Sequence, residues 1–229
     1  MKFILIIILV IIIFKIHQEK IHIDFKTFFK KGFKKIDNKF GLFCYTGKQG
    51  KGKTYSAIKF IIEQKLKYNY TILTNVKSFN VFDDTLYFQD INDIIDYCVG
   101  FQGNEKNVII FFDEIFTILE KKTPINKKIL SFLSQLRKRK IILVTTAQEW
   151  SEINITFRRY VRYQISCNMF SIPLFKNAII YNTINDGDLI RWNNDIQDFE
   201  APRISANLSK GNQSIIQSYD TFETIQTSK

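Results

Sequence analysis

The stretch "CYTGKQGKGKTYSA", residues 44–57, contains the pattern GxxxxGK[ST] and decides the expected fold. Gly47, Gly52, Lys53 and Thr54 fill its fixed positions. Glycines let successive backbone N–H groups surround phosphates, the lysine reaches the β- and γ-phosphates, and the threonine hydroxyl binds Mg²⁺. The pattern therefore predicts a loop that binds a nucleoside triphosphate.

The sequence on both sides of the loop favours this interpretation. "GLFCYT", residues 41–46, is an apolar run typical of a strand, and residues 55–68 carry apolar side chains at helical spacing. A helix that begins there directs its N-terminal dipole at the phosphates. The alternative is a surface turn rich in glycine and lysine. We expect ATP to be bound by Gly47, Lys48, Gln49, Gly50, Lys51, Gly52, Lys53, Thr54 and Tyr55.

A second apolar run, "NVIIFFDEI" at residues 107–115, ends in two acids. Such a run is typical of a central parallel strand, and ligands bind at the carboxyl ends of these strands. We expect Asp113, together with Thr54, to bind Mg²⁺, and Glu114 to orient or deprotonate the attacking water. The alternative is an acidic cap on the next helix. A glutamate at the second position favours a hydrolase over a kinase.

The length and composition indicate one core domain of the α/β class, with a mostly parallel sheet, over residues 41–229. Three widely spaced cysteines predict reduced thiols. The only histidines are His17 and His22, which excludes a histidine-based triad from the main domain. Near the C-terminus, a turn signal at residues 185–187 between two β-prone runs predicts a β-hairpin.

The N-terminus contains the unbroken apolar run "FILIIILVIIIF", residues 3–14. It is shorter than the roughly 20 residues of a typical membrane-spanning helix. A cleaved signal peptide and a buried core element are alternatives. We expect a membrane anchor at residues 1–18 and a basic juxtamembrane segment at 19–40, because lysines follow the run at positions 15, 20, 26, 30, 31, 34 and 35.

The net charge of +11 lies mainly beside this run. Residues 1–40 carry nine lysines and three acids, or +6, which leaves 24 basic and 19 acidic side chains, or +5, for residues 41–229. The lysines predict a single pass through the cytoplasmic membrane, with the N-terminus outside and the main domain in the cytoplasm.

A third apolar run, "KIILVTTAQEW" at residues 140–150, ends in polar residues. Its Gln148 is predicted to sense the γ-phosphate or position the water, since an amide both donates and accepts hydrogen bonds; a turn glutamine is the alternative. Further on, Arg158 and Arg159 are candidates for an arginine finger, which stabilises transition-state charge in a neighbouring subunit. Contact with DNA phosphates and a solvated basic face are the alternatives.

Taken together, the order of these features resembles the FtsK–HerA superfamily and, within it, the Zot-like proteins of filamentous phages. The resemblance spans residues 41 to about 223. It rests on "YTGKQGKGKT" (45–54), "TILTNV" (71–76), "FFDEI" (111–115), "LVTTAQ" (143–148), "INITFRRYVRY" (153–163) and "QSYDTFE" (217–223).

The resemblance implies a RecA-like, ring-forming ATPase that uses ATP and Mg²⁺ in phage assembly or DNA translocation at a membrane. It implies that Lys53 and Thr54 bind phosphate and Mg²⁺, that Asp113 and Glu114 form the acidic pair, and that Gln148 is the sensor. The chain departs from the family in two respects. Its apolar run precedes the ATPase domain where the family usually has a membrane segment after it, and the family's usual histidine is missing from "LRKRKI" (136–141).

The function expected from these features is ATP-driven extrusion or packaging of phage DNA, preferably single-stranded, at the host membrane during virion assembly. The alternative is a membrane ATPase that powers coat-protein assembly or secretion without direct DNA binding.

Overall fold

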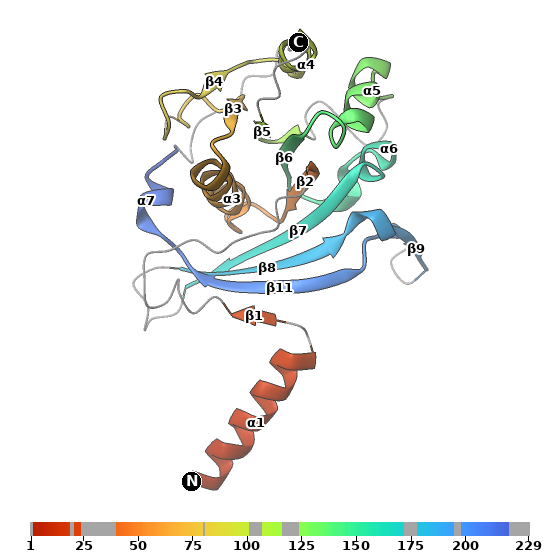
Figure 1. Cartoon of the computed structure of the whole chain (residues 1–229). Helices are drawn as coiled ribbons and strands as arrows, with labels where there is room; N and C mark the ends of the chain where they lie inside the picture. The colour runs from red at the N-terminus through yellow and green to blue at the C-terminus, as the bar shows by residue number, and fades with distance from the viewer. Residues whose placement is uncertain are drawn as a thin grey trace.

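A nine-stranded, mostly parallel sheet forms the centre of the computed structural model (Figure 1). The structure describes residues 2–18, 21–23, 40–79, 81–100, 107–115, 124–171, 178–194 and 198–219. The strands, in spatial order, are β1 (Ile21–Ile23), β11 (Arg203–Lys210), β8 (Ile179–Asp186), β7 (Val161–Phe170), β2 (Gly41–Thr46), β6 (Ile141–Ala147), β5 (Val108–Phe112), β3 (Thr71–Thr74) and β4 (Leu86–Tyr87). All neighbours from β7 to β4 are parallel, which confirms the predicted α/β fold.

Two apolar layers cover the sheet, and the alternation of side chains along its strands explains them. Leu42 and Cys44 of β2 belong to one layer, whereas Phe43 and Tyr45 belong to the other. The first layer contains α4 (Ile91–Gly100) and α5 (Lys127–Gln135), and the second contains α3 (Lys53–Tyr68) and α7 (Gln213–Ile216). Because helices cover both faces, the central strands are apolar almost throughout.

The order of the strands brings three strand ends together. β6 lies between β2 and β5, with Ala147 opposite Thr46 and Thr145 opposite Phe112. The residues that follow β2, β5 and β6 therefore meet at one edge of the sheet. The sequence predicted these three strands but not their order.

The predicted β-hairpin across residues 185–187 is wrong in its pairing. β8 pairs with β7 and β11, whereas β9 (Arg191–Asn193) pairs with β10 (Asp198–Glu200) in a separate two-stranded sheet. The turn between β8 and β9 is η3 (Gly187–Leu189). A Cβ on Gly187 would lie 1.9 Å from the Val161 carbonyl oxygen, so the chain presses against β7 there and leaves the sheet. The hairpin forms one strand later.

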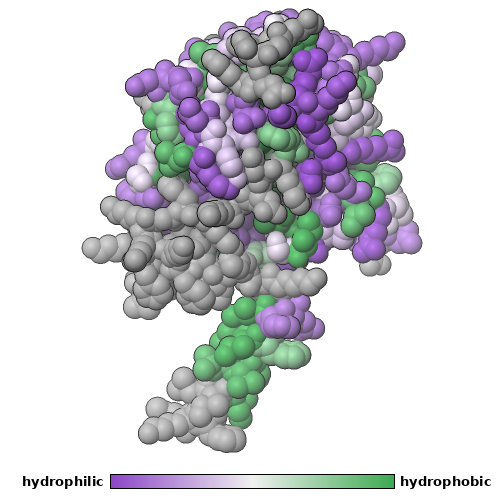
Figure 2. Space-filling model, in the orientation of Figure 1, coloured by the Kyte–Doolittle hydropathy of each residue, from purple (hydrophilic) through white to green (hydrophobic). Residues whose placement is uncertain are grey.

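The predicted membrane helix corresponds to α1 (Lys2–Gln18), which has 17 residues. All its side chains at positions 7–14 are apolar and between 46% and 68% exposed. Figure 2 shows this helix as an apolar projection. The prediction of a spanning helix is not supported: in the part of the chain that the structure describes, no helix is long and apolar enough to cross a membrane. At 1.5 Å per residue α1 extends about 25 Å, against about 30 Å of hydrocarbon. The lysines predicted to follow it between positions 20 and 35 lie outside the described residues.

Candidate nucleotide-binding site

The predicted phosphate loop connects the end of β2 to the start of α3. The backbone of Gly52 is left-handed, with φ +80°, which favours glycine. Gly47 packs closely, since an added Cβ would lie 2.7 Å from the Cys167 carbonyl oxygen. Between them, residues 48–50 and Lys51 are exposed, so that the loop is open to a ligand. The backbone conformation and the exposure of residues 47–52 are therefore those expected of a phosphate-binding loop.

The first turn of α3 holds the residues predicted to bind phosphate and Mg²⁺. Lys53 and Thr54 are its first two residues, and both are partly exposed. The N–H groups of a first helical turn lack acceptors within the helix, which suits them to phosphate. Tyr55 differs, because its ring is buried and its hydroxyl accepts a hydrogen bond from the Asn212 backbone N–H at 2.8 Å. The Tyr55 side chain therefore faces α7 and not the loop.

The carboxylate of Asp113 joins α3 to the ends of β5 and β6. Its Oδ2 accepts a hydrogen bond from the Thr54 hydroxyl at 3.4 Å, and its Oδ1 accepts one from the Thr146 hydroxyl. The Thr146 oxygen in turn accepts the Glu114 backbone N–H at 2.9 Å. The predicted Mg²⁺ ligands, Thr54 and Asp113, thus lie side by side.

Asn75, at the end of β3, fixes the backbone of Asp113. The Asp113 N–H donates to the Asn75 side-chain oxygen at 2.8 Å, and the Asn75 amide donates to the Asp113 carbonyl at 3.2 Å. These two bonds continue the pairing of β3 and β5 by one residue. Asn75 therefore fixes the backbone from which the Asp113 carboxylate extends.

The surroundings of Asp113 favour its neutral form. Burial, and to a smaller degree the Glu114 charge, raise the pKa of this carboxyl, whereas the Thr146 hydroxyl, the Lys53 charge and the Thr54 hydroxyl lower it. The net effect is a pKa raised to about 6. A hydroxyl and a carboxylate that converge in this way match the oxygen ligands that Mg²⁺ prefers. A bound cation would also favour the ionised carboxylate.

Glu114 and Gln148 lie at the same edge of the sheet. Glu114 has a left-handed backbone, with φ +54°, which is uncommon for a residue other than glycine. The backbone carbonyl of Gln148 accepts the Gly47 N–H at 3.1 Å, and Gln148 is exposed. The structure therefore places the Gln148 backbone against the phosphate loop, and the Glu114 backbone against Thr146 of the neighbouring strand β6.

The two predicted finger arginines lie elsewhere. α6 (Ile155–Arg158) leads into β7, whose Val161 pairs with Leu42 near the amino end of β2, whereas the phosphate loop follows the carboxyl end. Five residues of a strand span roughly 17 Å. Neither arginine is therefore next to the nucleotide site of its own chain.

The Arg158 side chain is buried, with 1% exposure, and contacts Trp150 and Phe199. Its guanidinium lies 5.6 Å from the Trp150 ring centre and donates to the Phe199 carbonyl at 3.5 Å. The Trp150 indole, in η2 (Trp150–Glu152), donates to the same carbonyl at 3.1 Å. Arg158 thus ties α6 to β10, while Arg159 is exposed.

Two residues of the site were missed at the sequence level, Asn75 and Thr146. Each ends an apolar strand, in "TILTN" and "LVTT", where a polar residue signals a position at the ligand edge. Their contacts depend on which strands flank β5, and strand order is not visible in the sequence.

This fold and this loop define the class of the protein, a P-loop NTPase. Residues 41–191 match the family "Zonular occludens toxin (Zot)", and the chain belongs to this family. No curated protein matches the chain in sequence.

Several solved structures are similar to this chain. The genome packaging NTPase B204 from Sulfolobus turreted icosahedral virus 2, in complex with ATP-gammaS, has a TM-score of 0.52 and 12% identity, covering 74% of this chain and 100% of that chain. The N-terminal domain of zonular occludens toxin from Neisseria meningitidis has a TM-score of 0.45 and 14% identity, covering 62% and 82%. FlaH, a flagellar accessory protein from Methanocaldococcus jannaschii, has a TM-score of 0.42 and 12% identity, covering 64% and 77%.

The raised pKa of Asp113 makes a prediction for the protein without nucleotide or Mg²⁺. The folded state binds this proton more tightly than the unfolded state, so the stability of the wild type falls as the pH rises from about 4 to about 6. Asp113→Asn removes the buried charge. It should raise the free energy of unfolding by up to about 3 kcal/mol at pH 7.5 and change it little at pH 4.

Denaturant unfolding at both pH values measures this difference. The exposed Asp83 provides a control, Asp83→Asn, that should change little at either pH. An Asp113→Asn protein less stable than the wild type at pH 7.5 would contradict the prediction.

Proposed function

We propose that this chain is an ATP hydrolase that drives extrusion or packaging of viral DNA during virion assembly. The observation that carries the proposal is the contact of Asp113 with Thr54 beside the phosphate loop. Membership of the Zot family supports it.

In this mechanism, the loop N–H groups and Lys53 hold the triphosphate, while Thr54 and Asp113 hold Mg²⁺. The cation neutralises charge on the phosphate oxygens. Glu114 orients the attacking water or accepts its proton, and Gln148 contacts the γ-phosphate or the water. The Glu114 N–H bond to Thr146 fixes the backbone from which this side chain extends.

DNA is the preferred substrate of the motor, and we favour single-stranded DNA. B204, which shares the fold, is a genome packaging NTPase.

A specific observation supports the second candidate, an ATPase for coat-protein assembly or secretion. Residues 41–229 carry a net charge of only +5, from 24 basic and 19 acidic side chains, which is modest for a protein that grips DNA.

ATP hydrolysis by the full chain, with and without single- or double-stranded DNA across a salt series, tests this proposal. Hydrolysis should rise with DNA and the stimulation should fade with salt.

Lys53→Ala should abolish turnover, and Glu114→Gln should bind ATP but stop hydrolysis. Hydrolysis that no DNA changes would move the assignment to the protein-assembly ATPase. Wild-type turnover by Glu114→Gln would remove Glu114 from its role.

We also propose a homo-oligomeric ring in which Arg159 reaches the nucleotide of the neighbouring subunit. Its exposure, and its distance from the loop of its own chain, support an action in trans. The burial of Arg158, which is 1% exposed, favours Arg159 over Arg158 for this role.

Paired variants of the two arginines test the ring. Arg158→Ala should lower the free energy of unfolding by about 3 kcal/mol, because a buried side chain is lost. Arg159→Ala should change it by less than about 0.5 kcal/mol yet lose hydrolysis by about a thousandfold. Mixing Arg159→Ala with Lys53→Ala should restore activity, since one subunit supplies the loop and the other supplies the arginine. No recovery in mixed oligomers would contradict a finger in trans.

Attachment to the host cytoplasmic membrane through α1 is a further part of the proposal, with the main domain in the cytoplasm. The exposed apolar side chains at positions 7–14 and the lysine-rich sequence that follows support it. The full chain should float with vesicles, more with phosphatidylglycerol than with phosphatidylcholine alone, and deletion of residues 2–18 should abolish flotation. A full chain that stays with the soluble fraction would contradict attachment.

A further inference from the structure

One face of α3 forms polar contacts with the C-terminal part of the chain. Directly after the phosphate-binding pair, the Tyr55 hydroxyl accepts the Asn212 N–H at 2.8 Å, and the Ser56 hydroxyl accepts the Asn182 side-chain amide at 3.0 Å. Tyr55 and Ser56 are both buried. Both therefore make directional contacts within the interior of the protein.

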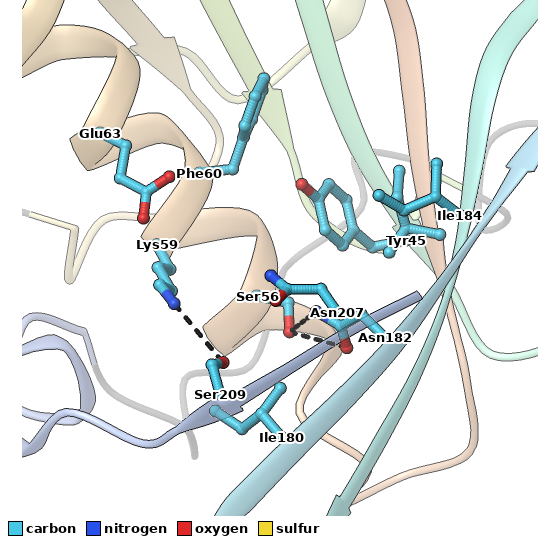
Figure 3. Close-up of a pocket in the computed structure, with 11 residues that line it drawn as sticks. Tyr45, Ser56, Lys59, Phe60, Glu63, Ile180, Asn182, Ile184, Asn207 and Ser209 are labelled. Atoms are coloured by element: carbon cyan, nitrogen blue, oxygen red, sulfur yellow. Dashed lines mark hydrogen bonds between the residues drawn. The ribbon is translucent and has the colours of Figure 1, made fainter. Parts of the chain in front are cut away.

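A third contact lies one turn further along the helix. The Lys59 ammonium donates to the Ser209 hydroxyl of β11 at 3.5 Å, and Ser209 is 3% exposed. Figure 3 shows these side chains around a pocket between α3 and the strands, whose lining includes Glu63 and Asn207. Polar groups thus occupy a boundary where apolar packing is usual.

The chain after β11 continues along the same face of α3. Figure 1 shows α7 beside α3. Ile215 of α7 is 1% exposed and packs in the apolar layer that contains Tyr55. Tyr219 packs against this layer as well. Burial raises the pKa of Tyr219 to about 12, and the charge of Asp113 adds to the shift, which is consistent with a place near the predicted Mg²⁺ ligand.

We propose that residues 209–219 are a positioning element of the nucleotide site, holding α3 through Tyr55 and Lys59 so that Lys53 and Thr54 meet the triphosphate correctly. Apolar packing is non-directional and tolerates a small rotation of a helix, whereas hydrogen bonds fix it. Catalytic groups need placement within about 0.5 Å. The element lies beyond residues 41–191, which match the family. The inference rests on the proposed ATPase function.

Tyr55→Phe in the full chain tests the proposal, because it removes the acceptor of the Asn212 N–H and keeps the ring. The kcat for ATP should fall about tenfold, with the KM changed less than about threefold. Tyr181→Phe is the matched control: its hydroxyl accepts a hydrogen bond from Arg203 of β11 at 2.9 Å, and the alternation of side chains along β8 places Tyr181 on the face opposite Asn182. That variant should keep the wild-type kcat.

Ser209→Ala provides a second, smaller change from the strand side, and its kcat should fall about threefold. Variants that lose thermal stability but keep the wild-type kcat per folded molecule would overturn the proposal, because the contacts would then be only structural. If the wild type itself does not hydrolyse ATP, the proposed function fails separately. Hydrogen–deuterium exchange at the first turn of α3, with an ATP analogue bound, then decides: Tyr55→Phe should lower the protection of Lys53 and Thr54, and protection equal to that of the wild type overturns the positioning role.

Discussion

The carboxylate of Asp113, held between two threonine hydroxyls, is the interaction on which the site depends. One threonine begins α3 and the other ends β6, so this single side chain joins the phosphate-binding helix to two strands. Asn75 ties the same residue to β3. Four elements therefore converge on one acid whose burial favours its neutral form. An environment that disfavours an unpaired charge is one in which a cation is favoured.

The strand order explains why this convergence is possible. Because β6 lies between β2 and β5, the loop, the acids and Gln148 occupy adjacent strand ends. The two arginines, in contrast, lie beyond the amino end of β7. The exposure of Arg159 at the edge opposite the phosphate loop is the feature that supports the proposed action of one copy of the chain on another.

Local patterns in the sequence predicted much of this arrangement. The phosphate loop, the acidic strand end and the strand before Gln148 each depend on a few consecutive residues, and the parallel sheet follows from their apolar runs. The separation of β8 and β9 into two sheets could not be predicted in this way, because it depends on how closely Gly187 approaches Val161. The roles of Arg158, Asn75 and Thr146 likewise depend on neighbours distant in the chain. The composition around Arg158 resembled that of a basic surface, yet Trp150 and Phe199 enclose it.

The pairing of β1 with β11 has a consequence for synthesis on the ribosome. β11 pairs with β8 on one side and with β1 on the other, so a segment made near the start of the chain covers a strand made near its end. Residues 21–23 must wait for nearly the whole protein to emerge before they find this partner. Until β11 has been made, the edge of residues 21–23 remains available to strands of other chains. Conditions that keep nascent chains apart during this interval would therefore protect them from pairing with one another.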